Sequence, residues 1–266
     1  MRIALANIRY PPTPDASVQF AIDAINDASR QRAHIVCFPE AYVPGYRMPG
    51  RHVPAPDAAF LDRSWKTIAE AAGRADIAVV LGTERIVSGT LLLTALVIDR
   101  DGSIAGFQDK VQIDPSEEPT YGQGCERRIF TTGPLTFGVT ICHEGWRYPE
   151  ATRFAARRGA QIVFHPFMHW PEPGSYRPTM FADPKNTFHE KAMLCRAAEN
   201  TVYFAGVNCA FDGAPATSAI VNPDGTLLAY QPYGKEGLLV ADIDLAAATG
   251  LLAKRLVEYP SLDVGA

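Results

Sequence analysis

The chain has 266 residues, of which 47% are hydrophobic and 20% charged, and this composition excludes a long disordered or collagen-like protein. Its formal net charge of −4 provides no basic footprint, so we expect no nucleic-acid partner. It also has no uninterrupted apolar run long enough to span a bilayer, so we expect no membrane partner.

The first residues and the cysteines bear on compartment and domain number. Residues 1–6 lack the basic region, apolar core and cleavage site of a secretory leader. The five cysteines are scattered and form no C-x-x-C pair, so we predict neither a disulfide framework nor a zinc site. No linker or shift in composition divides the chain. We therefore predict a cytoplasmic protein with a single domain over residues 1–266.

The N-terminal half alternates predicted strands and helices. A proline-rich loop follows the first strand, and Asp15 or Ser17 is the candidate N-cap of a helix whose apolar residues fall at helical spacing. An Asp-Gly turn at residues 101–102 predicts a hairpin between the last two strands. The predicted elements are a strand over 2–8, the first helix, a strand over 34–38, a helix over 58–75 and strands over 78–82, 91–99 and 104–109.

The C-terminal half continues the alternation. Residues 169–184 are rich in proline, glycine and aromatic residues without periodicity, and we expect either a lid over a pocket or a surface or dimer contact. The predicted elements are a strand over 135–141, a helix over 147–158, a strand over 161–164, a helix over 186–200, strands over 202–207, 218–222, 226–231 and 237–243, and a short helix near 245–254.

This order of elements predicts the fold class. Strands alternating with helices, with hairpins between them, indicate an α/β protein with mixed strand directions, in two sheets or one large one with helices outside. The chain lacks the G-x-G-x-x-G motif of dinucleotide-binding folds and the G-x-x-x-x-G-K-[ST] phosphate-binding loop. A nucleotide-binding fold of either kind is therefore not indicated.

A cysteine stands where the strand over 135–141 ends. A cysteine at a strand end can be held rigidly and still be reached by substrate, as nucleophilic catalysis requires. The alternative is a small buried hydrophobic residue, the commonest role of free cysteine. Polar residues follow Cys142 directly, and we expect Glu144 to be a structural carboxylate that pairs with Arg147 or a neighbouring backbone N–H.

Two further ionisable residues share this position in the predicted sheets. Glu40 and Lys110 each stand at or just beyond the carboxyl end of a strand, the side on which open α/β sheets carry their chemistry. A carboxylate can take the thiol proton of Cys142, and an ammonium group favours the thiolate and stabilises the oxyanion formed by its attack on a carbonyl. The three residues are therefore a consistent catalytic set.

The segments around these residues resemble those of the nitrilase superfamily, the carbon–nitrogen hydrolases. Phe38-Pro39-Glu40 is similar to the segment with the catalytic Glu of that family, residues 109–113 to its Lys segment and residues 138–150 to its Cys segment. Residues 195–200 resemble its Arg-Ala-x-Glu-Asn helix, and residues 218–225 its late hairpin. The resemblance covers nearly the whole chain in the order of the family. It implies a four-layer α-β-β-α sandwich that pairs into a homodimer or higher homo-oligomer.

The resemblance also implies residue roles. Cys142 would be the nucleophile, Glu40 the general base and Lys110 the oxyanion stabiliser. A second carboxylate, Glu117 or the adjacent Glu118, would complete the site. The implied reaction attacks the carbon of a small-molecule amide, carbamoyl or nitrile group, releases ammonia and leaves a thioester that water hydrolyses. No metal or organic cofactor is implied, and the histidine spacing shows no metal-ligand motif.

We expect the substrate to be bound by His143 next to the nucleophile and by a set of aromatic and polar residues, namely Tyr46, Phe167, His169 and Trp170. Nitrilases typically have Trp after the cysteine and amidases often Tyr, so His143 leaves the substrate subclass open. The leading hypothesis is an amidohydrolase, and nitrile hydrolysis by the same residues is the runner-up. A non-catalytic binding module, and a papain-like Cys-His hydrolase using His143 or His165, are the remaining alternatives.

Overall fold

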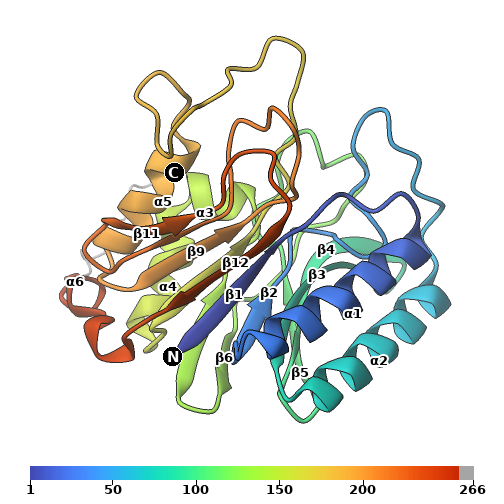
Figure 1. Cartoon of the computed structure of the whole chain (residues 1–266), viewed down its shortest axis with the longest axis horizontal. Helices are drawn as coiled ribbons and strands as arrows, with labels where there is room; N and C mark the ends of the chain where they lie inside the picture. The colour runs from blue at the N-terminus through green and yellow to red at the C-terminus, as the bar shows by residue number, and fades with distance from the viewer. Residues whose placement is uncertain (258–266) are drawn as a thin grey trace, which may run out of the picture.

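The computed structural model describes residues 1–257, which form two six-stranded sheets stacked between helices (Figure 1). The first sheet contains, in spatial order, β12 (Gly237–Asp242), β1 (Arg2–Asn7), β2 (Ile35–Cys37), β3 (Ala78–Val87), β4 (Thr90–Ile98) and β5 (Ile104–Asp109). The second contains β11 (Leu227–Tyr230), β10 (Ala219–Val221), β9 (Tyr203–Val207), β8 (Ile162–Pro166), β7 (Leu135–Val139) and β6 (Ile129–Thr132).

The two sheets repeat one pattern of strand directions. In the first, β1, β2 and β3 are parallel, and antiparallel strands flank them. In the second, β7, β8 and β9 are parallel, again with antiparallel strands outside. The parallel strands of each sheet therefore end at the same edge, where the loops that follow them meet.

Because side chains alternate along each strand, one face of each sheet packs against the other sheet and the opposite face packs against helices. Ile3 and Leu5 of β1 lie in the cluster between the sheets, together with Phe164 of β8. Ala4 and Ala6, the intervening residues, lie in the cluster that includes the helices on the outer face. Both faces of the strand are apolar because both are covered, as expected for parallel strands in an α/β fold.

Helices cover both outer faces, which completes a four-layer α-β-β-α sandwich (Figure 1). In that view α1 and α2 lie over the first sheet, on the right, and α4 and α5 lie over the second, on the left. The helices are α1 (Pro14–Arg30), α2 (Ala58–Ala75), α3 (His143–Arg147), α4 (Pro149–Arg157), α5 (His189–Ala198) and α6 (Leu251–Lys254), with a 3₁₀ turn η1 (Leu245–Ala247).

Several local features differ from the sequence-based expectations. The N-cap of α1 is Thr13, not Asp15 or Ser17: its hydroxyl accepts a hydrogen bond from Ala16 N–H at 3.1 Å, and a proline follows at the first helical position. The predicted helix near 245–254 is divided into η1 and α6. The short strand β6 was not expected, because its few residues carry too little alternation to be distinguished from a loop.

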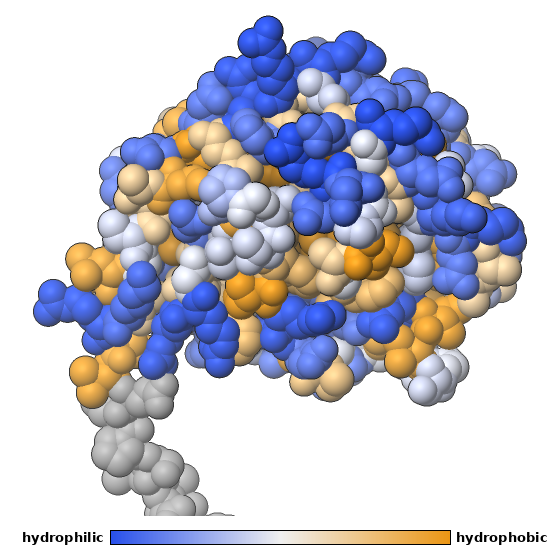
Figure 2. Space-filling view, turned by 90° about the horizontal axis from the view of Figure 1, so that it is seen from below, coloured by the Kyte–Doolittle hydropathy of each residue, from blue (hydrophilic) through white to orange (hydrophobic). Residues whose placement is uncertain are grey.

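The loops that follow β2, β5, β7 and β8 gather at one end of the molecule, the top in Figure 1. The opposite end, seen from below in Figure 2, is mainly hydrophilic, with hydrophobic residues in separate small patches. Among the described residues, no helix is both long and apolar enough to cross a membrane. Because the parallel strands of both sheets end where these loops gather, this end of the molecule is the expected position of a site.

Candidate active site

Cys142 lies in the tight turn between β7 and α3. Its φ of 48° and ψ of −111° lie in a sparsely populated region for a residue with a side chain, which costs on the order of 1–3 kcal/mol. Its N–H donates to the carbonyl of Pro166 at 2.8 Å, and its own carbonyl accepts from Gly145 N–H at 3.0 Å and contacts His165 Nε2 at 2.8 Å. A Cβ on Gly145 would lie 2.5 Å from the His165 ring, so only glycine fits this turn. The backbone of Cys142 is therefore fixed from three sides.

Glu144 ties the turn of Cys142 to the segment after Lys110. Its side chain is fully buried and accepts hydrogen bonds at 2.6–2.9 Å. The donors are the backbone N–H groups of Val111, Gln112 and Ile141 and the guanidinium of Arg127. The expected backbone partners are thus confirmed, whereas the cation is Arg127 and not Arg147. Because one carboxylate joins the two loops, it fixes their relative position.

Lys110, Glu40 and Glu117 form a buried ionic cluster beside the cysteine. Lys110 Nζ donates to Glu40 Oε1 at 2.8 Å and to Glu117 Oε2 and Oε1 at 2.7 and 2.9 Å. The lysine and Glu40 side chains are no more than 1% exposed, and that of Glu117 is 4% exposed. Glu118 points to solvent. Between the two carboxylates that the sequence left open, the structure brings Glu117 into the cluster.

Two neighbouring residues of the loop after Glu40 hold that cluster in place. The hydroxyl of Tyr46 donates to Glu117 Oε1 at 2.7 Å. Arg47 makes a two-point ion pair with the fully buried Glu84 at 2.7 and 2.9 Å, and Tyr121 donates to the same carboxylate at 2.8 Å. The ion pair anchors the loop, so Tyr46 is held against Glu117.

The electrostatics of the cluster favour a protonated thiol next to a base. Burial raises the pKa of the Cys142 thiol well above its usual range, and the Glu40 charge raises it further, with Lys110 acting against both. Burial also raises the pKa of Glu40 to about 7, although Lys110 opposes the shift. Burial acts to lower the pKa of Lys110, but Glu40, Cys142 and Glu117 outweigh it and keep the pKa above its usual value.

One oxygen of Glu40 is free for proton transfer. Oε1 accepts from Lys110, whereas Oε2 is buried and has no partner of ordinary hydrogen-bond geometry within residues 1–257. The thiol of Cys142 is close enough to act as a hydrogen-bond donor that lowers the pKa of Glu40. Oε2 is therefore the Glu40 oxygen left free to accept a proton.

A cavity of about 740 Å³ opens above Cys142. Of the expected substrate-binding residues, His143, Tyr46, His169 and Trp170 line it. Phe167 does not: its side chain is fully buried behind the wall, where it packs against Trp146 at a ring distance of 4.9 Å. The apolar side chain of Phe167 faces the helices rather than the cavity because it follows the strand alternation of β8.

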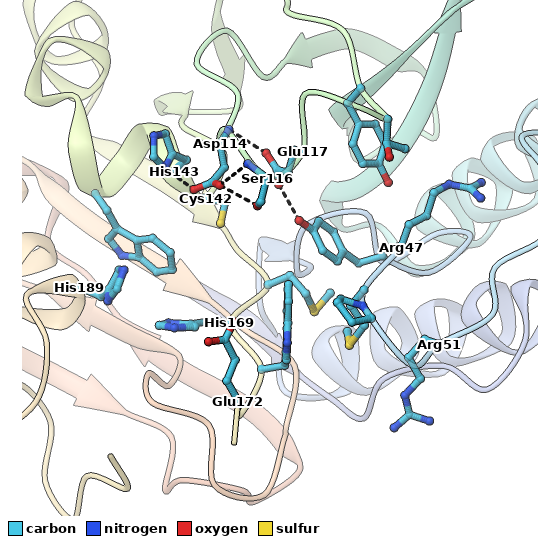
Figure 3. A pocket seen from close by; sticks show the side chains of 18 of the residues that line it. Arg47, Arg51, Asp114, Ser116, Glu117, Cys142, His143, His169, Glu172 and His189 are labelled. Carbon is cyan, nitrogen blue, oxygen red and sulfur yellow. Dashed lines mark hydrogen bonds and ion pairs between the residues drawn. The ribbon is translucent and has the colours of Figure 1, made fainter. Parts of the chain in front are cut away.

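The cavity also contains residues that the sequence did not single out. His189 at the start of α5 and Asp114 lie on opposite walls in Figure 3, with Cys142 between them. Asp114 Oδ2 contacts His143 Nδ1 at 2.8 Å. Burial lowers the pKa of His143, and the Asp114 charge acts in the opposite direction. No sequence signal marks His189, since a histidine at a helix start is compatible with an ordinary surface residue.

The placement of the ionisable side chains also bears on metal binding. Within the described part of the chain, no group of three or more His, Cys, Asp or Glu side chains is placed to hold a metal ion. Around Cys142, Lys110 pairs with Glu40 and Glu117, and His143 contacts Asp114.

Comparisons with known proteins extend these observations. The model of the carbon–nitrogen hydrolase family matches residues 2–251. A nitrilase from Pyrococcus abyssi is 26% identical over 87% of this chain and 85% of its own length, and the human omega-amidase is 26% identical over 92% and 88%. An amidase from Nesterenkonia sp. AN1 superimposes with a TM-score of 0.77 at 25% identity, covering 94% of this chain and 95% of its own. A mutant of that amidase has been solved with acrylamide added to its active-site cysteine.

Proposed function

The chain belongs to the carbon–nitrogen hydrolase family, and from this premise we propose that it hydrolyses a small linear amide or N-carbamoyl compound through a cysteine thioester. The observation that carries the proposal is the Lys110 ammonium, which donates hydrogen bonds to Glu40 and Glu117 at 2.7–2.9 Å. It lies beneath a cavity that Cys142 lines. A non-catalytic module would not need three buried charges beside a cysteine that lines a cavity.

Acylation begins with proton transfer from the Cys142 thiol to Glu40 Oε2. The sulfur then bonds to the substrate carbonyl carbon, and the Lys110 ammonium stabilises the negative charge that develops on the oxygen. The backbone N–H of Met168 faces Cys142 and favours negative charge on its sulfur. The C–N bond breaks as Glu40 returns the proton to the leaving nitrogen, which departs as ammonia and leaves the acyl group on sulfur.

Deacylation uses the same carboxylate. Glu40 removes a proton from water, the resulting hydroxide oxygen bonds to the thioester carbon, and the C–S bond breaks. The acid leaves, and the proton returns from Glu40 to Cys142. Glu117 takes no proton in this scheme: with Tyr46 it holds Lys110 towards the oxyanion position. Glu40 serves as the base in both acylation and deacylation, because a pKa of about 7 lets it gain and lose a proton near neutral pH.

Nitrile hydrolysis is the second candidate, because the nitrilase from Pyrococcus abyssi matches this chain at the same 26% identity as the human omega-amidase. A nitrile would form a thioimidate on Cys142 and then the same thioester. A panel of matched amides and nitriles with ammonia detection separates the two. We expect turnover of amides, and turnover of nitriles with inert amides would reverse the order.

The same panel tests the role of Lys110. We expect Lys110→Met to abolish ammonia release from every substrate, because both the oxyanion partner and the neutralising charge of the cluster are lost. Retained turnover would favour a Cys-His scheme using His143 or His165 and would contradict the proposal.

We also propose that the protein is a cytoplasmic homodimer with one domain over residues 1–266. All five cysteines are free, which suits a reducing compartment. Met180, Leu228 and Tyr230 are 37–55% exposed, and the Tyr233 hydroxyl, which donates to the carbonyl of Met180, lies beside Tyr230. This exposed apolar group is the surface that a second copy would cover.

A further inference from the structure

The wall of the cavity that faces away from the ionic cluster is built from histidines. Four of the six histidines of the chain surround Trp146 or Cys142, and three of these, His143, His169 and His189, line the cavity. His169 and His189 lie edge to face with ring centroids 4.6 Å apart, and Figure 3 shows both on the side of the cavity across from Asp114 and Glu117. The proposed reaction uses neither of them.

The position of His169 is fixed by a buried amide. Its N–H donates to Asn208 Oδ1 at 3.0 Å, and its carbonyl accepts from Asn208 Nδ2 at 2.9 Å. Asn208 is fully buried, and its N–H donates to the hydroxyl of Ser218, which donates to Asn7 at the end of β1 in the other sheet. Because the Asn208 side chain binds both the backbone N–H and the carbonyl of His169, it fixes the backbone that carries the imidazole.

The position of His189 is fixed by two contacts. Its Nδ1 lies 2.7 Å from the Thr187 hydroxyl, and its ring packs on Trp146 at 4.5 Å. Nε2 of neither ring forms a hydrogen bond within residues 1–257, and Nδ1 of His169 is buried without a partner there, so each imidazole has a nitrogen available to a ligand in the cavity.

Both rings are neutral. Burial lowers the pKa of His169 to about 4, and burial, together with His169 and Arg147, lowers the pKa of His189 to about 3. A neutral imidazole donates or accepts one hydrogen bond at Nε2 but provides no charge for a carboxylate. Glu172 lines the cavity beside His169 and opposes a carboxylate at the rings, whereas Arg51 and Arg147, which also line the cavity, oppose an ammonium group.

We propose that His169 and His189 form an acyl-recognition wall that selects amides whose acyl chain carries an uncharged hydrogen-bonding group, such as a second carboxamide or a hydroxyl. This inference rests on the proposed function and specifies its substrate class. His169 and His189 contact the substrate, and Asn208 is a positioning residue that acts through His169. Trp146, Tyr46 and Trp170 provide apolar surface for the methylene groups between the two polar ends.

Four amides of equal chain length test the proposal: pentanamide, glutaramide, glutaramic acid and 5-aminopentanamide. We expect kcat/KM for glutaramide to exceed that for pentanamide by about tenfold or more, the value of one or two hydrogen bonds, and the two charged amides to be poorer than glutaramide. In His169→Leu the ratio of glutaramide to pentanamide should fall towards one. In Asn208→Ala the ratio should also fall towards one, with a larger change in KM than in kcat.

His52→Leu is the matched control, because His52 is exposed and does not line the cavity, and its ratio should equal that of the wild type. Preference for pentanamide or a charged amide, or an unchanged ratio in His169→Leu, overturns the acyl-recognition wall. If the wild type hydrolyses none of the amides, the proposed function fails instead. Calorimetric titration of glutaramide into Cys142→Ala then still tests the inference. The inference requires that glutaramide bind to this variant and that adding His169→Leu weaken the binding.

Discussion

At the scale of single residues, Glu117 is the second carboxylate that holds Lys110 in the buried cluster. Glu117 and Glu118 are adjacent in an acidic loop, and nothing in their sequence distinguishes the buried one from the exposed one. Hydrogen bonds from Lys110 and Tyr46 make the distinction, because Glu117 accepts them and Glu118 does not. Contacts between residues far apart along the chain cannot be read from spacing alone.

The pair provides a matched test. We expect Glu117→Gln to lower kcat by two orders of magnitude or more, since removing a charge that positions the oxyanion partner has the effect of losing an oxyanion donor, about 3–4 kcal/mol. Glu118→Gln should leave kcat and KM within about twofold of the wild type, because its side chain is exposed. Steady-state kinetics on one amide check both variants, and equal effects would contradict the assignment.

Glu40 makes the rate depend on pH. Its pKa is raised to about 7, so at lower pH it carries a proton and cannot accept another from Cys142. We therefore predict that kcat/KM rises about tenfold per pH unit below this value and levels above it. The apparent pKa belongs to the cluster with Lys110 and Glu117. A profile flat from pH 5 to 8 would rule out Glu40 as the base.

The raised pKa of Glu40 also affects stability, with the opposite pH trend. The folded state binds this proton more tightly than the unfolded state does, so the stabilisation is complete below the pKa of the unfolded chain, about 4.3, and is lost as pH rises through about 7. Activity and the contribution of Glu40 to stability therefore change in opposite directions over this range.

At the scale of elements, the turn from β7 to α3 shows what periodicity misses. The sequence predicted a helix from Arg147, where helix-forming residues begin, but α3 begins at His143, and Tyr148 separates it from α4, which begins at Pro149. Backbone contacts of Cys142 with Pro166 and Gly145, and the carboxylate of Glu144, hold this early start. Tertiary contacts override the local pattern here.

Glu144 should therefore be essential to the element although it does no chemistry. Glu144→Ala leaves three backbone N–H groups and the Arg127 guanidinium without their partner, and we expect a loss of roughly 3 kcal/mol or more in the free energy of unfolding. Urea denaturation measures it. Glu150→Ala on the exposed face of α4 is the control and should change stability by less than about 0.5 kcal/mol. Equal urea midpoints for the two variants would contradict this role.

At the scale of the whole molecule, the alternation of strands and helices predicted the α/β class, and the resemblance of three segments implied the four-layer sandwich that the structure has. The alternation alone did not decide between one sheet and two. That choice depends on pairings between residues far apart in the sequence, such as Arg2 of β1 with Asp242 of β12. It also depends on β6, too short to be recognised.

The proposed homodimer is tested at this scale. Met180→Glu with Tyr230→Glu places two charges on the exposed apolar surface, and we expect the sedimentation coefficient to change from that of a dimer to that of a monomer. Leu251→Glu, an exposed apolar residue on α6, is the control and should remain dimeric. A wild-type monomer, or a double variant that stays dimeric, would contradict the proposed surface.

The central claim is that the sulfur of Cys142 carries the acyl group of the substrate during turnover. Intact-mass spectrometry of the protein after rapid acid quenching with an amide substrate tests it directly. We predict a mass increase equal to the acyl group, located on the peptide containing Cys142 and absent from Cys142→Ala. Ammonia release with no adduct, or an adduct on Cys37, Cys125, Cys195 or Cys209, would contradict the account.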